Sequence, residues 1–437
     1  MSRRYAWYVV AVLTLANVSG FIDRQILSLL VVPIRRDLGL SLTEMSYLIG
    51  LPFAIFYSLM GLPIARLADS GNRRNVIAVG IALWSVMTAL CGLAGTYWRL
   101  LFARIGVGVG EAALQAPATS LISDYFPRDK LGGAMSVYAL GVFLGSGLAY
   151  FIGGWVVGLL SEQEAWHWPL IGSIRPWQTV FIVVGLPGLL IALLMLTVRE
   201  PERQDRSTGT VPVSTLFRYV RDNSRTFTCH SFGFALSATV NYGIAAWLAT
   251  FLIQTHGWSA ARAGMVQGSL TMTLGVLGVL AGGRLADSFV RQGHADGALR
   301  VGAIGAMGML VSATAYPLAG SAGVVVGWLV VVNFFAAFPW GAASAAAAEI
   351  MPARMRAQGV AIYFFVLSLV ASAVGPWSVA AVAEYGFGTD AALPQALAIV
   401  NVVGMCGAIS LFIIGMPAYR KTLAVRDAWS PPSSVRS

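Results

Sequence analysis

The stretch Gly61-Leu62-Pro63-Ile64-Ala65-Arg66-Leu67-Ala68-Asp69-Ser70-Gly71-Asn72-Arg73-Arg74 decides the fold of this chain. It joins two apolar runs, near 45–66 and 75–96, and each is long enough for the ~20 residues that a membrane-spanning helix needs. Its middle part recurs 218 residues later (283 − 65) as Gly283-Arg284-Leu285-Ala286-Asp287-Ser288. Both copies end an apolar run, which predicts two copies of one helix bundle.

Apolar runs of spanning length fill the rest of the chain. Hydrophobic residues make up 57% of the sequence and charged residues only 11%, whereas a soluble domain carries roughly 25% charged residues. We therefore predict an all-α polytopic membrane protein with twelve transmembrane helices in two six-helix bundles. The expected spans lie near 6–32, 45–66, 75–96, 99–122, 131–158, 176–198, 226–254, 263–285, 300–318, 322–347, 357–381 and 392–417.

A second internal repeat and the polar segments predict the domain boundaries. Asp124, Pro127, Gly133-Ala134 and Tyr138 match Glu349, Pro352, Gly359-Val360-Ala361 and Tyr363, at an offset near half the chain. The longest polar segment separates the two copies and reads as a connector. We expect an N-terminal bundle over 1–198, a cytoplasmic linker over 199–225, a C-terminal bundle over 226–418 and a disordered cytoplasmic tail over 419–437.

The positive charge predicts the orientation. The net charge is +10, and the basic residues lie in short gaps between apolar runs, without the interleaved aromatics of a nucleic-acid surface. With both termini in the cytoplasm, 22 of the 29 basic residues fall on the cytoplasmic side, as the positive-inside rule requires. We expect a multi-pass protein of the inner (plasma) membrane that contacts lipid, binds no nucleic acid and is a monomer.

Other residue types argue against an enzyme or an ATP-driven pump. The three cysteines lie inside apolar runs, and the sequence shows neither metal-ligand spacing nor a Ser-His-Asp set. A phosphate-binding loop with Gly-Lys-Ser or Gly-Lys-Thr is absent from the sequence. We therefore expect no cofactor, no metal and no catalytic residue.

Three charged residues fall at membrane depth. Asp23 lies about nine residues from the outer end of the first span, roughly 13 Å deep, and Arg104 lies about five residues into the fourth, roughly 8 Å deep. The two could therefore pair. Glu111 follows Arg104 by seven residues, which is two helical turns along the same face. A charge at the bilayer centre costs at least ~2.5 kcal/mol, so these residues must face a cavity or each other.

Such a set suits proton coupling and gating. A carboxylate beside an arginine stays ionised, and a buried carboxylate that loses this partner takes up a proton. The alternative is a static ion pair that fixes the first helix against the fourth. Arg24 lies one step, ~100°, around the helix from Asp23. It could face the cavity and bind an anionic headgroup, or extend to the outer surface.

The repeated stretch predicts a cytoplasmic gate. An acid at one helix end beside a basic turn can latch onto a neighbouring helix N-terminus, where the helix dipole favours anions. A solvated turn that only obeys the charge rule is the alternative. The expected gate residues are Asp69, Arg73, Arg74, Arg284 and Asp287.

The motifs resemble those of the major facilitator superfamily. The stretch Gly61 to Arg74 is similar to that family's loop between helices 2 and 3, and Arg104 with Gly106, Gly108 and Gly110 resembles its helix 4 motif. The resemblance implies two six-helix bundles around a central cavity.

A narrower resemblance is to the Spinster family. It rests on Asp23-Arg24-Gln25, Gly61 to Arg74, Leu83-Trp84-Ser85 and Arg104 to Ala112, and it covers the first half of the chain better than the second. In that family's sphingosine phosphate and lysophospholipid transporters, an Asp of helix 1 and an Arg and Glu of helix 4 take part in proton coupling and gating. Asp23, Arg104 and Glu111 match these residues.

The polar and aromatic residues of the remaining spans predict the substrate site. The spans of the second half hold no deep carboxylate, so an apolar cavity wall there suits an acyl chain or a hydrophobic drug. We expect a proton-coupled secondary transporter of a lysolipid-like substrate, working by alternating access. A small organic anion, held by Arg24 and Arg104, is the alternative. The expected substrate-binding residues are Arg24, Tyr57, Asn241, Tyr242, Trp340 and Tyr363.

Overall fold

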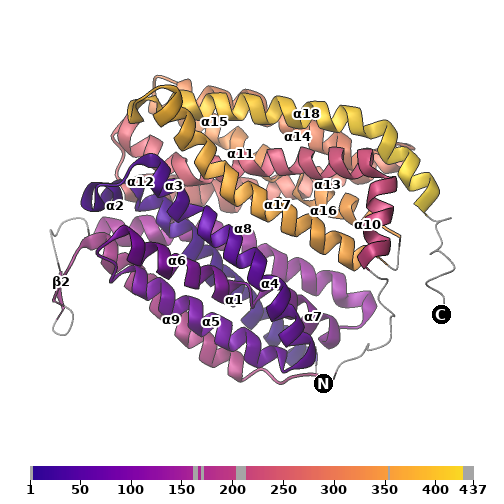
Figure 1. Ribbon diagram of the computed structural model, residues 1–437, viewed down its shortest axis with the longest axis horizontal. Helices are drawn as coiled ribbons and strands as arrows, with labels where there is room; N and C mark the ends of the chain where they lie inside the picture. Colours follow the sequence, from indigo (N-terminus) through magenta and orange to yellow (C-terminus); the bar gives the residue numbers. More distant parts are fainter. Residues whose placement is uncertain (1–2, 161–165, 169–171, 203–212, 353–354, 427–437) are drawn as a thin grey trace. The chain divides into compact units, whose positions relative to one another are not determined.

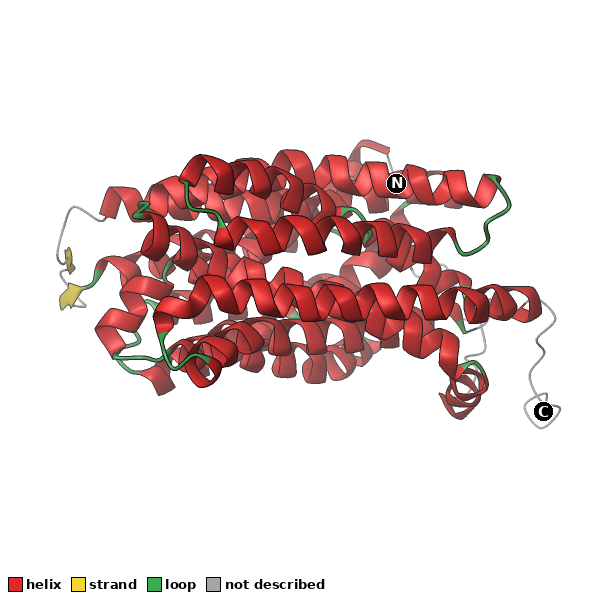
Figure 2. Cartoon of the chain, turned by 90° about the horizontal axis from the view of Figure 1, so that it is seen from above, coloured by secondary structure: helices red, strands yellow, loops and turns green. Residues whose placement is uncertain are grey.

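The computed structural model describes residues 3–160, 166–168, 172–202, 213–352 and 355–426. Nearly all of this part of the chain is helical, with one short pair of antiparallel strands, β1 (Trp166–Trp168) and β2 (Gly172–Ile174) (Figures 1 and 2). Eleven helical segments of the described residues are long and apolar enough to cross a membrane. The all-α polytopic fold class is confirmed.

The fourth predicted span, near 99–122, has no counterpart among these eleven segments because it is broken in the middle. It folds as α6 (Tyr97–Glu111) and α7 (Gln115–Tyr125), with 15 and 11 residues, and neither is long enough alone to cross a bilayer. The predicted separation of the spans near 300–318 and 322–347 is confirmed, because α14 (Gly297–Leu318) ends and α15 (Ala322–Ala337) begins there.

By spatial contacts the chain separates into two compact units. The first comprises residues 1–204, 244–272 and 372–391, and the second comprises 205–243, 273–371 and 392–437. Two helices, α11 (Ser224–His256) and α17 (Arg356–Ala381), therefore contribute residues to both units. The predicted division into halves at 199–225 stays a prediction.

In the first unit, α1 (Arg3–Leu29) packs along α8 (Arg128–Leu160), and α5 (Arg73–Cys91) packs along α6 and α9 (Pro176–Leu196). The other helical elements of this unit are α2 Val31–Leu38, α3 Leu42–Ile49, α4 Leu51–Ser70, α12 Ala260–Leu270, the π-helical turn Val382–Gly386 and most of the 3-10 turn Asp390–Ala392.

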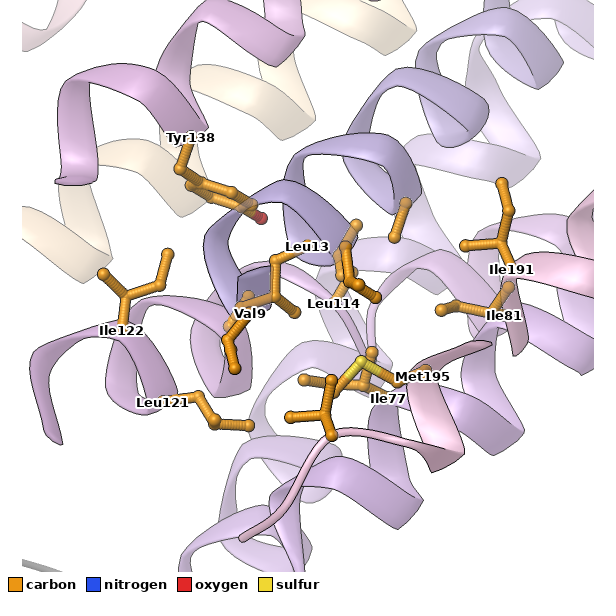
Figure 3. Close-up of a cluster of buried hydrophobic side chains, with 14 of the residues drawn as sticks. Val9, Leu13, Ile77, Ile81, Leu114, Leu121, Ile122, Tyr138, Ile191 and Met195 are labelled. Atoms are coloured by element: carbon orange, nitrogen blue, oxygen red, sulfur yellow. The ribbon is translucent and has the colours of Figure 1, made fainter. Parts of the chain in front are cut away.

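An apolar cluster fixes these helices against one another (Figure 3). Val9 and Leu13 of α1 meet Ile77 and Ile81 of α5 and Met195 of α9, all of them buried. Lipid is as apolar as these side chains, so close packing rather than transfer from water holds the helices together.

In the second unit, α14 packs against α15, α16 (Trp340–Glu349) and α18 (Leu393–Arg426). The unit also contains the connector helix α10 (Val213–Asp222), most of the π-helical turn Thr271–Gly275, and α13 (Val276–Arg291), which carries the repeated loop motif. Parts of α11 and α17 complete it.

Helices extend into two segments that lie outside the predicted bundles. The expected linker 199–225 contains α10, and α18 continues through residues 419–426 of the expected disordered tail. Buried contacts explain the second difference, because Tyr419 donates a hydrogen bond to Glu349 (3.1 Å) and the hydroxyls of Thr422 and Thr226 lie 2.8 Å apart. Residues 427–437 lie outside the described part of the chain.

Candidate functional site

The centre of the first unit contains an ion pair between α1 and the end of α6. Nε of Arg24 lies 2.5 Å from Oε2 of Glu111. The Glu111 side chain is only 3% exposed, whereas that of Arg24 is 21% exposed. Glu111 is the last residue of α6, and a helix C-terminus favours a neighbouring cation. The Glu111 carboxylate is therefore buried, while part of the Arg24 side chain stays accessible.

Three aromatic rings surround the Arg24 guanidinium. Its Cζ lies 4.4 Å from the ring centroid of Phe53, 4.9 Å from that of Tyr57 and 5.1 Å from that of Phe21. Ring faces attract a guanidinium, and the attraction grows where water is excluded. The sequence left the direction of Arg24 open, and the structure directs it inward onto Glu111 and these rings. Tyr57, predicted to bind substrate, lies beside it.

Asp23 and Arg104 also meet, but not through the predicted side-chain pair. Nη1 of Arg104 donates to the backbone carbonyl of Asp23 at 3.2 Å, and no ion pair within 4 Å joins the two side chains. Both residues are buried. Oδ1 of Asp23, Nε of Arg104 and Oε1 of Glu111 have no hydrogen-bond partner among the described residues. The site thus holds two buried carboxyl groups that can each accept a proton or a new donor.

Glycines set the approach of α5 and α6 that positions this site. A Cβ on Gly110 would lie 2.6 Å from the backbone nitrogen of Trp84 and 2.8 Å from the carbonyl oxygen of Gly80. These distances are too short for any side chain, so the two backbones can touch only at glycine. Arg104 and Glu111 are carried on this closely packed helix.

Arg73 anchors a second polar cluster at the start of α5. Its Nε donates to Glu200 (2.7 Å), and its Nη1 donates to Asp124 (2.6 Å) and Ser120 (2.8 Å). Glu200 also accepts a hydrogen bond from the backbone nitrogen of Arg74 at 3.0 Å. At the predicted gate, the acid that caps the N-terminus of α5 is therefore Glu200.

Two of the remaining predicted gate residues are not part of this cluster. Arg284 and Asp287 lie exposed on α13, and neither has an ion pair with another described residue. The side chain of Asp69 lies outside what the structure describes. Asp124 and Glu200 were not predicted. The repeat that matches Asp124 with Glu349 marked the first of them as a helix-end acid, and nothing in the sequence marked the second.

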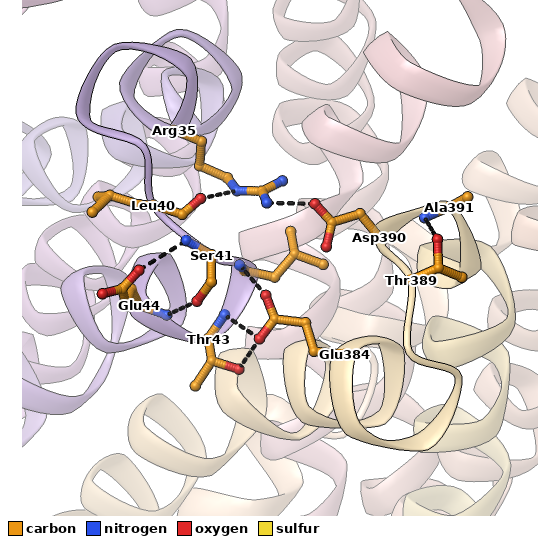
Figure 4. Close-up of polar contacts among 10 residues, drawn as sticks. Arg35, Leu40, Ser41, Thr43, Glu44, Glu384, Thr389, Asp390 and Ala391 are labelled. Atoms are coloured by element: carbon orange, nitrogen blue, oxygen red, sulfur yellow. Dashed lines mark hydrogen bonds and ion pairs between the residues drawn. The ribbon is translucent and has the colours of Figure 1, made fainter.

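A third cluster, also in the first unit, joins segments some 340 residues apart (Figure 4). The Glu384 carboxylate accepts hydrogen bonds from the backbone nitrogens of Leu42 and Thr43 and from the Thr43 hydroxyl. The next N–H of α3, that of Glu44, is bonded by the side chain of Ser41 (3.1 Å). Arg35 pairs with Asp390 beside it. Side chains therefore satisfy all three of the first N–H groups of α3.

The second unit has a small aromatic-lined cavity of about 50 Å³, enough for a few waters. All four substrate-binding residues predicted for the second half line it: Asn241, Tyr242, Trp340 and Tyr363. Nδ2 of Asn241 donates to the carbonyl of Ala336 (3.2 Å), while its Oδ1 and the Tyr363 hydroxyl have no partner among the described residues. The cavity lining is thus mostly apolar and aromatic, and two of its residues each carry a buried polar atom without a partner among the described residues.

His230 stands behind this wall and was not predicted to belong to the site. Its ring centroid lies 4.9 Å from that of Tyr363, and the residue is buried. A lone histidine in an apolar run gives no sequence signal for such a position.

Comparisons with known proteins agree with this architecture. The family model of the Major Facilitator Superfamily matches residues 13–376. An MFS-type efflux pump of Mycolicibacterium smegmatis is 31% identical over 297 residues, which are 66% of this chain and 64% of that protein. Protein spinster homolog 1 of Rattus norvegicus is 30% identical over 301 residues, 64% of this chain and 54% of that protein. The alignments therefore cover less than two thirds of either relative.

Solved structures extend the likeness over the whole chain. A bacterial homolog of the human lysosomal transporter Spinster, in an inward-facing and unoccupied conformation, has a TM-score of 0.80 at 30% identity, covering 99% of this chain and all of that one (100%). A D-xylose-proton symporter has a TM-score of 0.66 at 18% identity, over 92% of this chain and 97% of that one, which is a likeness of fold alone. The chain belongs to the major facilitator superfamily, and it is a membrane transporter of the Spinster type.

Proposed function

We propose that this protein is a proton-coupled secondary active transporter of an amphipathic, anionic lipid-like substrate, of the lysophospholipid or sphingosine phosphate class, working by alternating access. The observation that carries the proposal is the pair between a partly exposed Arg24 and a sealed Glu111. Two solved structures of a bacterial Spinster homolog, both inward-facing, one unoccupied and one occupied, support alternating access.

Arg24 is the group that would bind the substrate anion. A guanidinium can hold two phosphate oxygens at once through parallel N–H bonds. In this chain its Nε lies 2.5 Å from Glu111, and 21% of the side chain stays exposed beside the aromatic rings. An arriving phosphate would therefore compete with Glu111 for the same cation.

Glu111 and Asp23 would carry the protons. Once an anion draws Arg24 away, Glu111 is a buried carboxylate without a cation, and taking up a proton removes the cost of that charge. Asp23 is equally buried, and Arg104 contacts its backbone carbonyl rather than its carboxylate. Anion binding and proton uptake would then favour each other.

An apolar tail needs an apolar surface, and the rings of Phe21, Phe53 and Tyr57 offer one beside Arg24. The aromatic-lined cavity around Trp340 is a second candidate for tail binding. Amphipathic molecules satisfy both features of the site, the cation and the rings.

A second candidate substrate class is small organic anions or hydrophobic drugs. The relative from Mycolicibacterium smegmatis is named an efflux pump, and Arg24 would bind a carboxylate by the same fork geometry. Competition separates the two classes: lysolipids should displace a bound organic anion if the lipid-like substrate is correct.

The experiment is transport into proteoliposomes driven by a pH gradient. Asp23→Asn and Glu111→Gln should each abolish gradient-driven transport while the protein stays folded. Glu202→Gln, which changes an exposed carboxylate of the connector, is the matched control and should transport normally. Full activity in both buried variants would remove the proposed coupling. The same liposomes, with exposed protein termini tested by protease, would check the expected cytoplasmic orientation of both ends.

A further inference from the structure

The short helix α10 (Val213–Asp222) has two faces of opposite character. Leu216 and Tyr219 are buried against the second unit, and the Tyr219 hydroxyl donates to the carbonyl of Ile350 at 2.9 Å. On the opposite face, Phe217 is 61% exposed, and Arg218 and Arg221 are exposed beside it.

The chain itself places α10 at the surface of the bilayer. Only Asn223 separates it from α11, which is a candidate membrane span that begins at Ser224. The residue that its Tyr219 contacts, Ile350, directly follows another candidate span, Ala322–Glu349. Figure 1 shows α10 turned across the direction of α11, as a helix lying along a membrane surface would be.

The exposed face carries a net positive charge. Arg218, Arg221 and the nearby exposed Arg225 stand against one acid, Asp222, so the net charge is +2 (3 − 1). Arg221 and Asp222 approach to 3.8 Å, but their side chains are 79% and 59% exposed, and an ion pair so open to water holds neither group firmly. An exposed phenylalanine among arginines is typical of helices that rest in the headgroup layer.

We propose that the Phe217–Arg218–Arg221 face of α10 is a binding surface for anionic lipid headgroups. Phe217 would enter the boundary between headgroups and acyl chains, while the arginines bind phosphate groups around it. Docking of Tyr219 to the end of α16 would then connect the lipid composition of that leaflet to the second unit. This surface is separate from the Arg24 site and does not depend on the proposed substrate.

A fluorescent probe next to this face can measure the local lipid. Ser214→Cys places a thiol one helical turn before Arg218, and Cys406→Ala removes the exposed native cysteine. Bimane on residue 214 is followed in nanodiscs of phosphatidylcholine and phosphatidylglycerol, with bromine on the acyl chains of one lipid or the other. The ratio of the two quenching efficiencies reports enrichment of the anionic lipid.

We expect quenching by brominated phosphatidylglycerol to exceed that by phosphatidylcholine several-fold, since each basic residue near an anionic surface contributes roughly fivefold. The ratio should fall towards one in 0.5 M salt, where the screening length is only about 4 Å. Arg218→Gln with Arg221→Gln should remove the enrichment, and Arg218→Lys with Arg221→Lys should keep it.

Two controls make the result specific. Bimane on Val79→Cys, an exposed apolar position of α5, should report no preference for the anionic lipid. Arg36→Gln with Arg99→Gln removes two other exposed arginines and should leave the signal at residue 214 unchanged. Two results would overturn the proposal. One is a quenching ratio near one at residue 214 when both arginines are present. The other is a raised ratio that persists in Arg218→Gln with Arg221→Gln.

Discussion

Glu111 pairs with Arg24 at 2.5 Å, although Arg104 stands two turns before it on its own helix. Arg104 instead donates to the backbone of Asp23. The cation that pairs with Glu111 is therefore carried by α1 and is partly exposed, while the cation on α6 is buried and bound to a carbonyl. The first two predictions examine this arrangement.

Replacing Arg24 should remove selectivity for an anionic headgroup. A hydrogen bond to a charged group contributes about 1.5–3 kcal/mol, so Arg24→Ala should weaken binding of a phosphate-bearing ligand by roughly 10- to 100-fold. Calorimetry with sphingosine phosphate and with sphingosine measures the change. The wild-type protein should prefer the phosphate, and the variant should bind both equally.

Arg36→Gln serves as the control for this measurement, because it removes an exposed arginine of α2. A preference for the phosphate that persists in Arg24→Ala would mean that another cation binds the headgroup.

Anion binding should strengthen as the pH falls. Protonation of Glu111 removes the carboxylate that competes for Arg24, so acid conditions should favour the ligand in the wild-type protein. Glu111→Gln mimics the protonated acid and should bind tightly at every pH from about 5 to 8, because an amide side chain does not ionise. Ligand titrations at several pH values check this. The ligand here is a lysolipid with a phosphodiester, whose charge does not change over this range, because a phosphate monoester titrates near pH 6 itself. Binding that weakens in acid, or that still varies with pH in Glu111→Gln, contradicts the competition.

The sequence predicted which charged residues gather in this site, but not which of them bond. Depth along a helix follows from counting residues, so Asp23 and Arg104 could be placed at comparable depth, with Glu111 two turns further along the same face. The choice of partner depends on a rotation of ~100° between Asp23 and Arg24 and on the reach of a long side chain, which a linear pattern does not contain. Glu384 and Leu42 lie 342 residues apart, and no local pattern links an acid to a distant helix end.

Gly110→Ala should destabilise the protein without removing any polar contact. The added Cβ would lie 2.6 Å from the Trp84 nitrogen, so α5 and α6 must separate. Overpacking of this kind costs about 1–3 kcal/mol. Thermal unfolding in detergent should show a lower midpoint. Gly61→Ala is the matched control, because nothing lies within 4 Å of its Cβ, and alanine is the better helix former.

Glu384→Ala should loosen the start of α3. The carboxylate bonds the N–H groups of Leu42 and Thr43, and loss of a helix cap costs about 0.5–2 kcal/mol. Hydrogen exchange at these two amides should accelerate by up to about 30-fold. Asp390→Ala breaks the neighbouring pair with Arg35 but touches no α3 amide, so it should leave both rates unchanged. Equal acceleration in the two variants would point to a general opening of this region.

Arg73→Gln should be the most destabilising of these changes. Arg73 is buried and bonds two carboxylates, Asp124 and Glu200. Its loss leaves two acids close together without a cation, and breaking a buried pair in this way costs about 3–5 kcal/mol. The unfolding free energy in mixed micelles titrated with dodecyl sulfate measures the effect.

A neighbouring arginine and a second substitution test the cause. Arg74→Gln removes a side chain whose backbone contacts are only 3.4 and 3.5 Å long, and it should cost less than about 1 kcal/mol. Adding Glu200→Gln to Arg73→Gln should restore part of the lost stability, because one of the two uncompensated charges disappears. If the double variant were instead less stable than Arg73→Gln alone, the capping of the α5 N-terminus by Glu200, rather than its pairing with Arg73, would be the dominant contribution at this cluster.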